Sequence, residues 1–173
     1  MVRFIAVSND GRKFRISSEA LQLSDMWSQE ASKSETSSGA ADESEESEQV
    51  ELSGAVDGST LQLLIEWCEH YRLPQRPPAV PEGDFSKVQF SEWDTKFLRS
   101  LSHRELQLLT MAAKYLKVRS LLTLCVRFIY TTFVREQTVE KVRAFFGESD
   151  DFSYEEKEYM RYEREWLNGN DVY

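Results

Sequence analysis

The sequence has little of the material from which enzyme sites, metal sites and disulfide frameworks are built. It holds two cysteines and two histidines in 173 residues. Cys68 and Cys125 each lie inside an apolar run, which is typical of buried thiols in a reducing compartment. Cys68 and His70 are two positions apart on a predicted helix and therefore on different faces, which makes them poor zinc ligands. No phosphate-binding glycine loop, nucleophile elbow or H-E-x-x-H motif occurs, so the sequence argues against an enzyme.

Long apolar runs and an excess of positive charge are also missing. No run approaches the roughly 20 residues that span a bilayer, and Arg3 and Asp10 interrupt the N-terminal segment. With 21 basic and 30 acidic side chains, the net charge of −9 disfavours nucleic acid or an anionic membrane as the main partner. We therefore expect a soluble intracellular chain whose partner is another protein.

The first part of the chain predicts a small sheet, a short helix and a charged insertion. Extended runs at 2–7 and 13–17 flank an Asp-Gly turn, and 50–52 is a third strand candidate. A short helix is expected to start at Ser17 or Ser18 and to reach Trp27. Residues 28–49 hold seven serines and seven acids but no aromatic or branched aliphatic side chain, which predicts a disordered acidic loop.

The rest of the chain predicts helices. The apolar spacing indicates a helix at 60–72 with a capping box formed by Ser59 and Gln62, and all four prolines fall in a linker at 73–90. Neither glycine nor proline occurs between Gly83 and Gly147, and the helix after Ser120 is apolar on nearly every side. An α+β chain with a helical C-terminal half follows. Further helix starts are expected at Ser91, Ser102, Thr138 and Ser153, with capping boxes at Ser102/Glu105 and Ser153/Glu156.

Charge and large apolar side chains are unevenly distributed in the second half. Residues 96–143 hold ten bases and three acids, whereas 148–166 hold eight acids and three bases. This segregation serves either pairing within the molecule or electrostatic steering of a protein partner. The large apolar side chains of the last third are either local core or a groove for a partner's helices. They are Phe133, Val142, Phe145, Phe146, Phe152, Tyr154, Tyr159, Met160, Tyr162 and Trp166.

Several short motifs follow one another in an order that is more specific than any of them alone. They are Asp10-Gly11 with Phe14, the acidic loop, Ile65-Glu66-Trp67-Cys68-Glu69-His70, the proline linker, Trp93-Asp94 with Phe97-Leu98, Ala112-Ala113-Lys114-Tyr115-Leu116 with Val118 and Leu121-Leu122, Val142-Arg143, Phe146, Asp151-Phe152 and Trp166. In order and spacing they resemble the S-phase kinase-associated protein one family. Its members are small adaptors that join F-box proteins to a cullin in SCF ubiquitin ligases.

The resemblance implies a BTB/POZ-like fold, a small three-stranded sheet with helices, over residues 1–134. It implies a helical F-box-binding extension over 135–173. The implied function is that of a non-catalytic adaptor in ubiquitin-dependent protein degradation, located in the cytoplasm and nucleus, with no cofactor. The implied partners are F-box proteins and a cullin, with neither nucleic acid nor membrane. A weak homodimer in the absence of an F-box protein is left open.

The resemblance also carries candidate binding residues. For the cullin they are Lys114 and Tyr115, where Tyr115 matches a tyrosine of the family and Lys114 stands where asparagine is usual. A second interpretation is a structural or oligomerisation module that binds F-box-like proteins or itself without a cullin. Lys114 and a short segment between Phe14 and Trp27 keep that alternative open. For the F-box the candidates are Leu122, Val126, Ile129, Val142, Phe146, Phe152 and Trp166.

Overall fold

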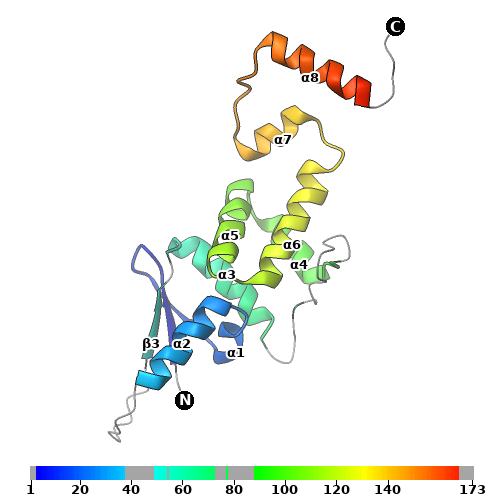
Figure 1. The fold of residues 1–173 in the computed structure, drawn as a ribbon. Helices are drawn as coiled ribbons and strands as arrows, with labels where there is room; N and C mark the ends of the chain where they lie inside the picture. The colour runs from blue at the N-terminus through cyan, green and yellow to red at the C-terminus, as the bar shows by residue number, and fades with distance from the viewer. Residues whose placement is uncertain (1–2, 38–48, 54, 73–76, 78–87, 168–173) are drawn as a thin grey trace, which may run out of the picture. The chain divides into compact units, whose positions relative to one another are not determined.

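The computed structural model describes residues 3–37, 49–53, 55–72, 77 and 88–167 (Figure 1). The chain divides into two compact units, Met1–Thr132 and Phe133–Tyr173, and each is described by itself. The first unit holds a small sheet with helices α1 to α6, and the second holds α7 and α8. This mostly helical content with a small sheet confirms the predicted α+β class.

The sheet has three strands in the order β2-β1-β3. The strands are β1 (Arg3–Val7), β2 (Lys13–Ile16) and β3 (Gln49–Ser53). Strand β1 pairs antiparallel with β2, with Phe4 opposite Ile16, and parallel with β3, with Phe4 opposite Val50. Gly11 supplies a φ of 77° in the turn between β1 and β2, which an L side chain rarely adopts. The predicted hairpin and third strand are therefore confirmed.

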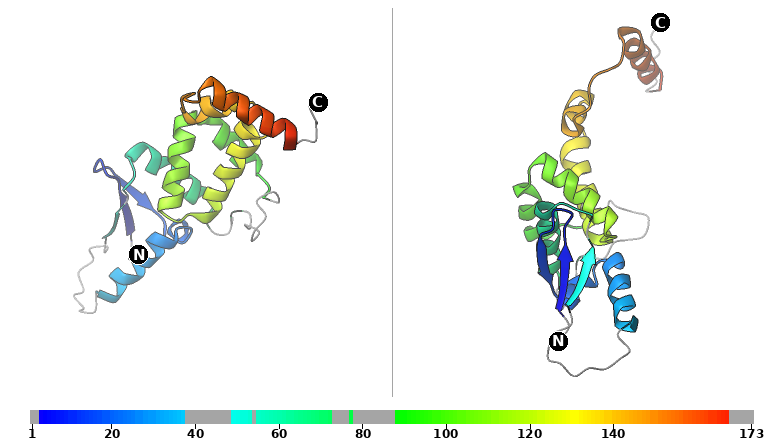
Figure 2. Two further views of the ribbon diagram at one scale, coloured as in Figure 1. Left: turned by 45° about the horizontal axis from the view of Figure 1, so that its top comes forward. Right: turned by 90° about the vertical axis from the view of Figure 1, so that its left-hand side faces the viewer.

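Parallel neighbours need a crossover, and the described part of the connection between β1 and β3 holds two helices after β2. Helices α1 (Ser18–Leu21) and α2 (Asp25–Ser37) lie in this connection, and α2 lies beside β3 (Figure 2). Ser17 caps α1, since its Oγ accepts a hydrogen bond from the Ala20 N–H at 3.2 Å. The predicted disordered loop at 28–49 must be corrected for 28–37, which are helical, and for Gln49, which begins β3, while 38–48 lie outside the described residues.

Tertiary anchors explain why α2 forms where composition indicated a loop. Trp27 and Ala31 lie one helical turn apart and are both buried, so an alanine is enough to continue the apolar side that the tryptophan begins. Ser24 joins the start of α2 to the end of α5 (His103–Tyr115), because its Oγ donates to the carbonyl of the following residue, Leu116, at 2.6 Å and accepts from the Trp27 N–H at 3.2 Å. The serine and glutamate content of the segment cannot predict these contacts, because they join residues that are far apart in the sequence.

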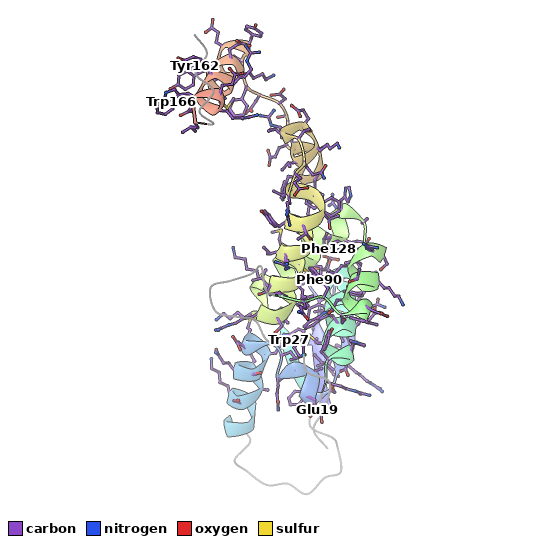
Figure 3. The ribbon with its side chains drawn as sticks, turned by 90° about the vertical axis from the view of Figure 1, so that its right-hand side faces the viewer. Glu19, Trp27, Phe90, Phe128, Tyr162 and Trp166 are labelled. Carbon is purple, nitrogen blue, oxygen red and sulfur yellow. The ribbon has the colours of Figure 1, made fainter. Side chains whose placement is uncertain are left out.

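The helical core of the first unit is built from α3, α5 and α6. The helices are α3 (Gly58–His70), α4 (Glu92–Ser100), α5 (His103–Tyr115) and α6 (Arg119–Ile129). Helix α5 packs against both α3 and α6 and is the central helix of the three. Phe128 on the buried side of α6 packs edge-on against Phe90 with ring centroids 6.2 Å apart (Figure 3). Side chains that are fully buried in this core include Leu61, Leu64, Trp67, Leu106, Leu109, Leu121 and Leu124.

Helix caps set the starts of these helices. The predicted capping box at Ser102 is confirmed, and Ser91 forms a further box with Asp94. The predicted box at Ser59 is wrong: α3 starts earlier because an Asp57 carboxylate oxygen accepts from the Thr60 N–H at 3.0 Å. Of the predicted proline linker at 73–90, residues 73–76 and 78–87 lie outside the described residues.

The second unit contains α7 (Val139–Phe146) and α8 (Tyr154–Leu167). A π-helical turn, η2 (Tyr130–Val134), follows α6 directly and includes the boundary between the two units in sequence. Gly147 ends α7 with a left-handed φ of 74°. Ser153 and Glu156 form the predicted capping box of α8, with Ser153 N–H donating to Glu156 at 2.8 Å and Ser153 Oγ accepting from Glu156 N–H at 3.3 Å. None of the described helices is both long and apolar enough to cross a membrane.

Candidate protein-binding surfaces

Exposed large hydrophobic side chains gather in the second half of the described chain, from the end of α5 onward. Large apolar groups that face water on several neighbouring helices are typical of protein-binding surfaces. The exposed residues are Met111, Tyr115, Val126, Tyr130, Val139, Phe146, Phe152, Tyr154, Tyr159, Tyr162, Trp166 and Leu167. They fall into three groups, on α5, on α6 and on the second unit.

The first group forms a stripe on α5 that is exposed except for the half-buried Leu108, and we call it the α5 face. It consists of Arg104, Leu108, Met111, Lys114 and Tyr115, and the spacing of 104, 108, 111 and 115 puts these residues on one side of the helix. Met111 and Tyr115 are 68% and 48% exposed, whereas the opposite side of α5 is buried in the core. Two cations therefore flank a short apolar stripe.

The C-terminal end of the α5 face is held in place by the start of α2. Besides the hydrogen bond from Ser24, the Asp25 N–H donates to the Lys117 carbonyl at 3.5 Å, and Arg119 Nε lies 3.0 Å from an Asp25 carboxylate oxygen. Lys117 takes a left-handed φ of 55°, which turns the chain from α5 into α6. Tyr115 is thus presented from a fixed helix end.

Sequence reasoning identified only part of the α5 face. Lys114 and Tyr115, the predicted cullin residues, are adjacent and both exposed. Met111, Leu108 and Arg104 were missed. They lie four, seven and eleven positions before Tyr115, so extending the helical spacing backward from the tyrosine would have found them.

The second group lies on α6 in the first unit. Leu122 and Ile129 are half-buried, Val126 is 43% exposed, and the spacing of 122, 126 and 129 places all three predicted residues on one side of the helix. Tyr130, which follows α6 and is 53% exposed, extends this stripe and was not predicted. The other side of α6 is buried. We call these four residues the α6 face.

The third group belongs to the second unit and begins around α7. Phe145 is buried and stacks on Phe133 with ring centroids 4.3 Å apart, so these two rings form a local core. Val142 is half-buried, while Phe146 is 48% exposed and Phe152 is 40% exposed. Of the three predicted residues here, Val142 is therefore partly packed, whereas Phe146 and Phe152 are exposed.

Helix α8 has no buried residue. Trp166 is 66% exposed and shares one side of the helix with Tyr159 and Tyr162, since positions 159, 162 and 166 follow i, i+3 and i+7 spacing. Tyr162 and Trp166 can be followed along α8 in Figure 3. The predicted Trp166 is thus the end of an exposed aromatic stripe.

An ion-pair cluster fixes the connection between α7 and α8. Asp150 accepts from Arg143 Nη1 at 2.7 Å and lies 2.7 Å from Lys157 Nζ through its other oxygen. The hydrogen bond from Lys157 and the nearby Arg143 charge hold the pKa of the Asp150 carboxyl below its usual range. The Arg143 guanidinium also lies 4.9 Å from the ring centroid of Phe152. One side chain of α7 therefore orders both an acid and an exposed aromatic ring.

The motifs around Trp67 and Asp94 are structural. Asp94 is buried and accepts from Trp67 Nε1 at 3.1 Å and from the Tyr71 hydroxyl at 2.6 Å. Burial raises the pKa of the Cys68 thiol, and burial raises the pKa of Cys125 to about 12, so both thiols stay protonated. Among the described residues no group of three or more histidine, cysteine or acidic side chains is arranged to hold a metal ion.

Comparison with known proteins shows which proteins this chain is similar to. The family model described as "Skp1 family, dimerisation domain" matches residues 119–167, which contain α6, η2, α7 and α8. "SKP1-like protein 10" of Arabidopsis thaliana is 31% identical over 111 residues, covering 64% of this chain and 68% of that protein.

Two fungal relatives are similar to the chain over comparable lengths. "E3 ubiquitin ligase complex SCF subunit sconC" of Arthroderma benhamiae is 30% identical over 115 residues, covering 64% of this chain and 68% of that protein. "Suppressor of kinetochore protein 1" of Schizosaccharomyces pombe is 29% identical over 114 residues, covering 64% of this chain and 70% of that protein. The stretch matched by the family model is also the stretch where most of the exposed apolar side chains lie.

Proposed function

The chain belongs to the Skp1 family, and we propose that it serves as the adaptor subunit of an SCF-type ubiquitin ligase, joining an F-box protein to a cullin. The name of the sconC relative, an SCF subunit, supports this role. The chain itself is not an enzyme but a non-catalytic subunit. The observation that carries the proposal is the presence of several exposed apolar surfaces: the α5 face and the α6 face, which the buried core of the first unit supports, and the exposed side chains of α7, Phe152 and α8 in the second unit.

The F-box protein binds the later helices in this proposal. The α6 face offers an apolar stripe of the kind that receives an amphipathic helix. Phe146, Phe152 and Trp166 in the second unit supply large side chains that a partner with several helices would cover in turn. Tryptophan is enriched among residues that dominate binding energy, so Trp166 is the expected main contact.

The cullin binds the α5 face in this proposal. Tyr115 combines an apolar ring with a polar hydroxyl, a side chain enriched at interfaces, and Met111 gives an adaptable apolar neighbour. Lys114 and Arg104 add positive charge at the edge of the stripe. Because an ammonium that is buried without a partner is costly, the matching cullin surface is expected to carry an acid near Lys114.

A BTB/POZ-like fold is the finer fold assignment that we propose for the first unit. The three-stranded sheet with its parallel β1–β3 pair and the packed helices α3, α5 and α6 support it. We further propose that the adaptor acts in the cytoplasm and nucleus, without nucleic acid or membrane as a partner. Its domain boundary is proposed near residue 134, two positions after the end of the first unit at Thr132.

Lys114 supports a second candidate function. Its charge replaces a neutral amide expected from the family resemblance, so a cullin without a matching acid would bind more weakly. The chain would then be a structural or oligomerisation module that binds F-box-like proteins or itself without a cullin.

Affinity purification of the intact tagged chain, with quantification of each co-purifying protein, tests the proposal. Recovery of both F-box proteins and a cullin is the expected result. Recovery of F-box proteins alone would replace the adaptor by the structural module. Absence of both partners from a chain shown to be folded by its thermal unfolding would refute both functions.

A further inference from the structure

The exposed side of α8 has the spacing of a helix that packs against another helix. Glu155, Tyr159, Tyr162 and Trp166 are separated by four, three and four residues, which is the alternation of the seam positions of a coiled coil. We call these four residues the α8 seam. At 1.5 Å per residue the seam extends over about 16 Å, enough to face three turns of a partner helix. All four side chains are exposed.

Charge on α8 is sorted by the side of the helix. The positions that flank the seam are all glutamates, and the three bases of the helix follow i, i+4 and i+7 spacing on the other side. The flanking glutamates are Glu156, Glu158, Glu163 and Glu165, and the bases are Lys157, Arg161 and Arg164. In coiled coils such flanking charges decide which partner is accepted.

The internal ion pairs of α8 leave much of this negative charge available. Arg161 lies 2.9 Å from Glu158 and 4.0 Å from Glu165, but these pairs are solvent-exposed, and exposed pairs contribute little free energy. Within the part of the chain that the structure describes, Glu155 and Glu163 form no ion pair. Glu155 occupies a seam position, where a packed partner would desolvate its carboxylate unless it supplied a cation.

We propose that the α8 seam packs against a helix of the F-box partner that carries lysine or arginine at its flanking positions. This inference rests on the proposed function and specifies the chemistry of the partner. Cations at the flanking positions pair with the row of glutamates, and a cation that reaches the seam lies over the rings of Tyr159, Tyr162 or Trp166, where cation–π attraction adds to the ion pair.

The same charge pattern argues against α8 pairing with α8 of a second copy. In such a pair the flanking glutamates of one helix would face those of the other, and like charges in these positions destabilise the contact. The bases relieve this repulsion only in part, because Arg161 makes solvent-exposed pairs with Glu158 and Glu165, and no base occupies a seam or flanking position. We therefore expect the α8 seam to bind a positively charged helix of a different protein.

Two synthetic peptides provide the direct test on the full chain. Both are three-heptad helices with the same leucine and isoleucine seam, and they differ only in having lysine or glutamate at every flanking position. By fluorescence anisotropy at about 0.05 M salt, we expect the lysine peptide to bind at least about tenfold more tightly, with the difference shrinking at about 0.5 M salt. Equal affinity of the two peptides, or binding of neither, would overturn the proposal.

Neighbouring residues on opposite sides of α8 supply matched variants. Glu163→Gln removes one flanking charge and is expected to weaken the lysine peptide by about threefold, whereas Arg164→Gln, on the outer side, should leave its affinity within twofold. If the two variants changed the affinity for the lysine peptide by equal factors in opposite directions, the net charge of the chain alone would determine binding. That result would refute binding at the α8 seam. Tyr162→Ala should weaken both peptides by about tenfold, because it removes seam packing.

Failure of this inference can be told apart from failure of the adaptor function. If the unmodified chain captures F-box proteins and Glu163→Lys captures them equally at low salt, the cationic helix is refuted and the adaptor role stands. If the lysine peptide binds as expected but no F-box protein is captured, the adaptor role fails and the seam chemistry stands. If the chain forms dimers that Tyr162→Ala dissociates, a second copy occupies α8 and the proposal is overturned.

Discussion

The α5 face and the α8 seam are both exposed apolar stripes at helical spacing, yet they differ in support and in charge. The α5 helix buries its other side in the core, whereas α8 has no buried residue. The α5 face includes the cations Arg104 and Lys114, while glutamates border the α8 seam. Apolar spacing alone would let either stripe accept any amphipathic helix. The opposite charges are therefore what would keep two protein partners on their own surfaces.

Two tryptophans give the strongest contrast between a surface and a core. Trp67→Ala should lower the free energy of unfolding by about 3–5 kcal/mol, because Trp67 is 1% exposed and donates to Asp94. Trp166→Ala should change stability by less than about 0.5 kcal/mol but weaken F-box binding by about 2 kcal/mol. Thermal unfolding and a binding titration measure the two effects. A large loss of stability in Trp166→Ala with unchanged affinity would make α8 a core element.

Tyr115 tests whether the α5 face serves one partner only. Tyr115→Ala should weaken cullin binding by about 2 kcal/mol and leave F-box binding unchanged, because the ring lies on the exposed side of α5. Leu109→Ala, on the buried side of the same helix, is the matched control and should instead cost about 2–5 kcal/mol of stability. Pull-downs against both partners, together with thermal melts, separate the outcomes. Loss of F-box binding from folded Tyr115→Ala would contradict separate surfaces.

Lys114 tests the contribution of charge to the α5 face. Lys114→Glu should weaken cullin binding by about 1 kcal/mol at low salt, since it reverses the charge presented to an acidic partner. Lys114→Asn should alter cullin binding by less, and neither change should affect F-box binding. Titrations at two salt concentrations measure this. Stronger cullin binding by Lys114→Glu would mean that the cullin surface is basic.

The smallest effect is expected at the connection that leads into α8. The folded state holds the pKa of Asp150 below its usual range, so its stabilising contribution is present at neutral pH and is lost as the pH falls through that lowered pKa. Asp150→Asn should reproduce this loss at neutral pH and speed amide hydrogen exchange at the start of α8, with little change in global unfolding. Unchanged exchange in the variant would show that the ion pairs do not order this connection.

Local signals explain which parts of the fold could be predicted from sequence. The capping boxes of α5 and α8 and the Asp-Gly hairpin were predicted because each depends on residues within four positions of one another. The part of α2 beyond Trp27 was missed because the anchors of this helix, from Ser24 to Leu116 and through Ala31, depend on tertiary contacts. The cap of α3 was predicted at Ser59 and lies at Asp57. The prediction started the helix too late because Gly58, its first residue, is a poor helix former.

The binding surfaces were only partly predictable for a related reason. Tyr115 and Trp166 came from resemblance, and helical spacing from Tyr115 would also have pointed to Met111. Whether the tyrosines of α8 form a surface or a core becomes clear only when their exposure is known. Counting charge along 148–166 showed an acidic block, but the sorting of glutamates and bases to different sides of α8 requires the helix limits. Exposure of a side chain depends on what the rest of the chain covers, which no local pattern contains.

The central claim, that one copy of the chain holds both partners at once, is tested most directly by sequential purification. The tagged chain is isolated first, an F-box protein recovered with it is then used for a second isolation, and the cullin is quantified in the doubly purified material. We predict that the cullin remains in proportion to the chain. A cullin that is recovered in the first step but lost in the second would mean that the partners compete for one surface, and it would contradict the account.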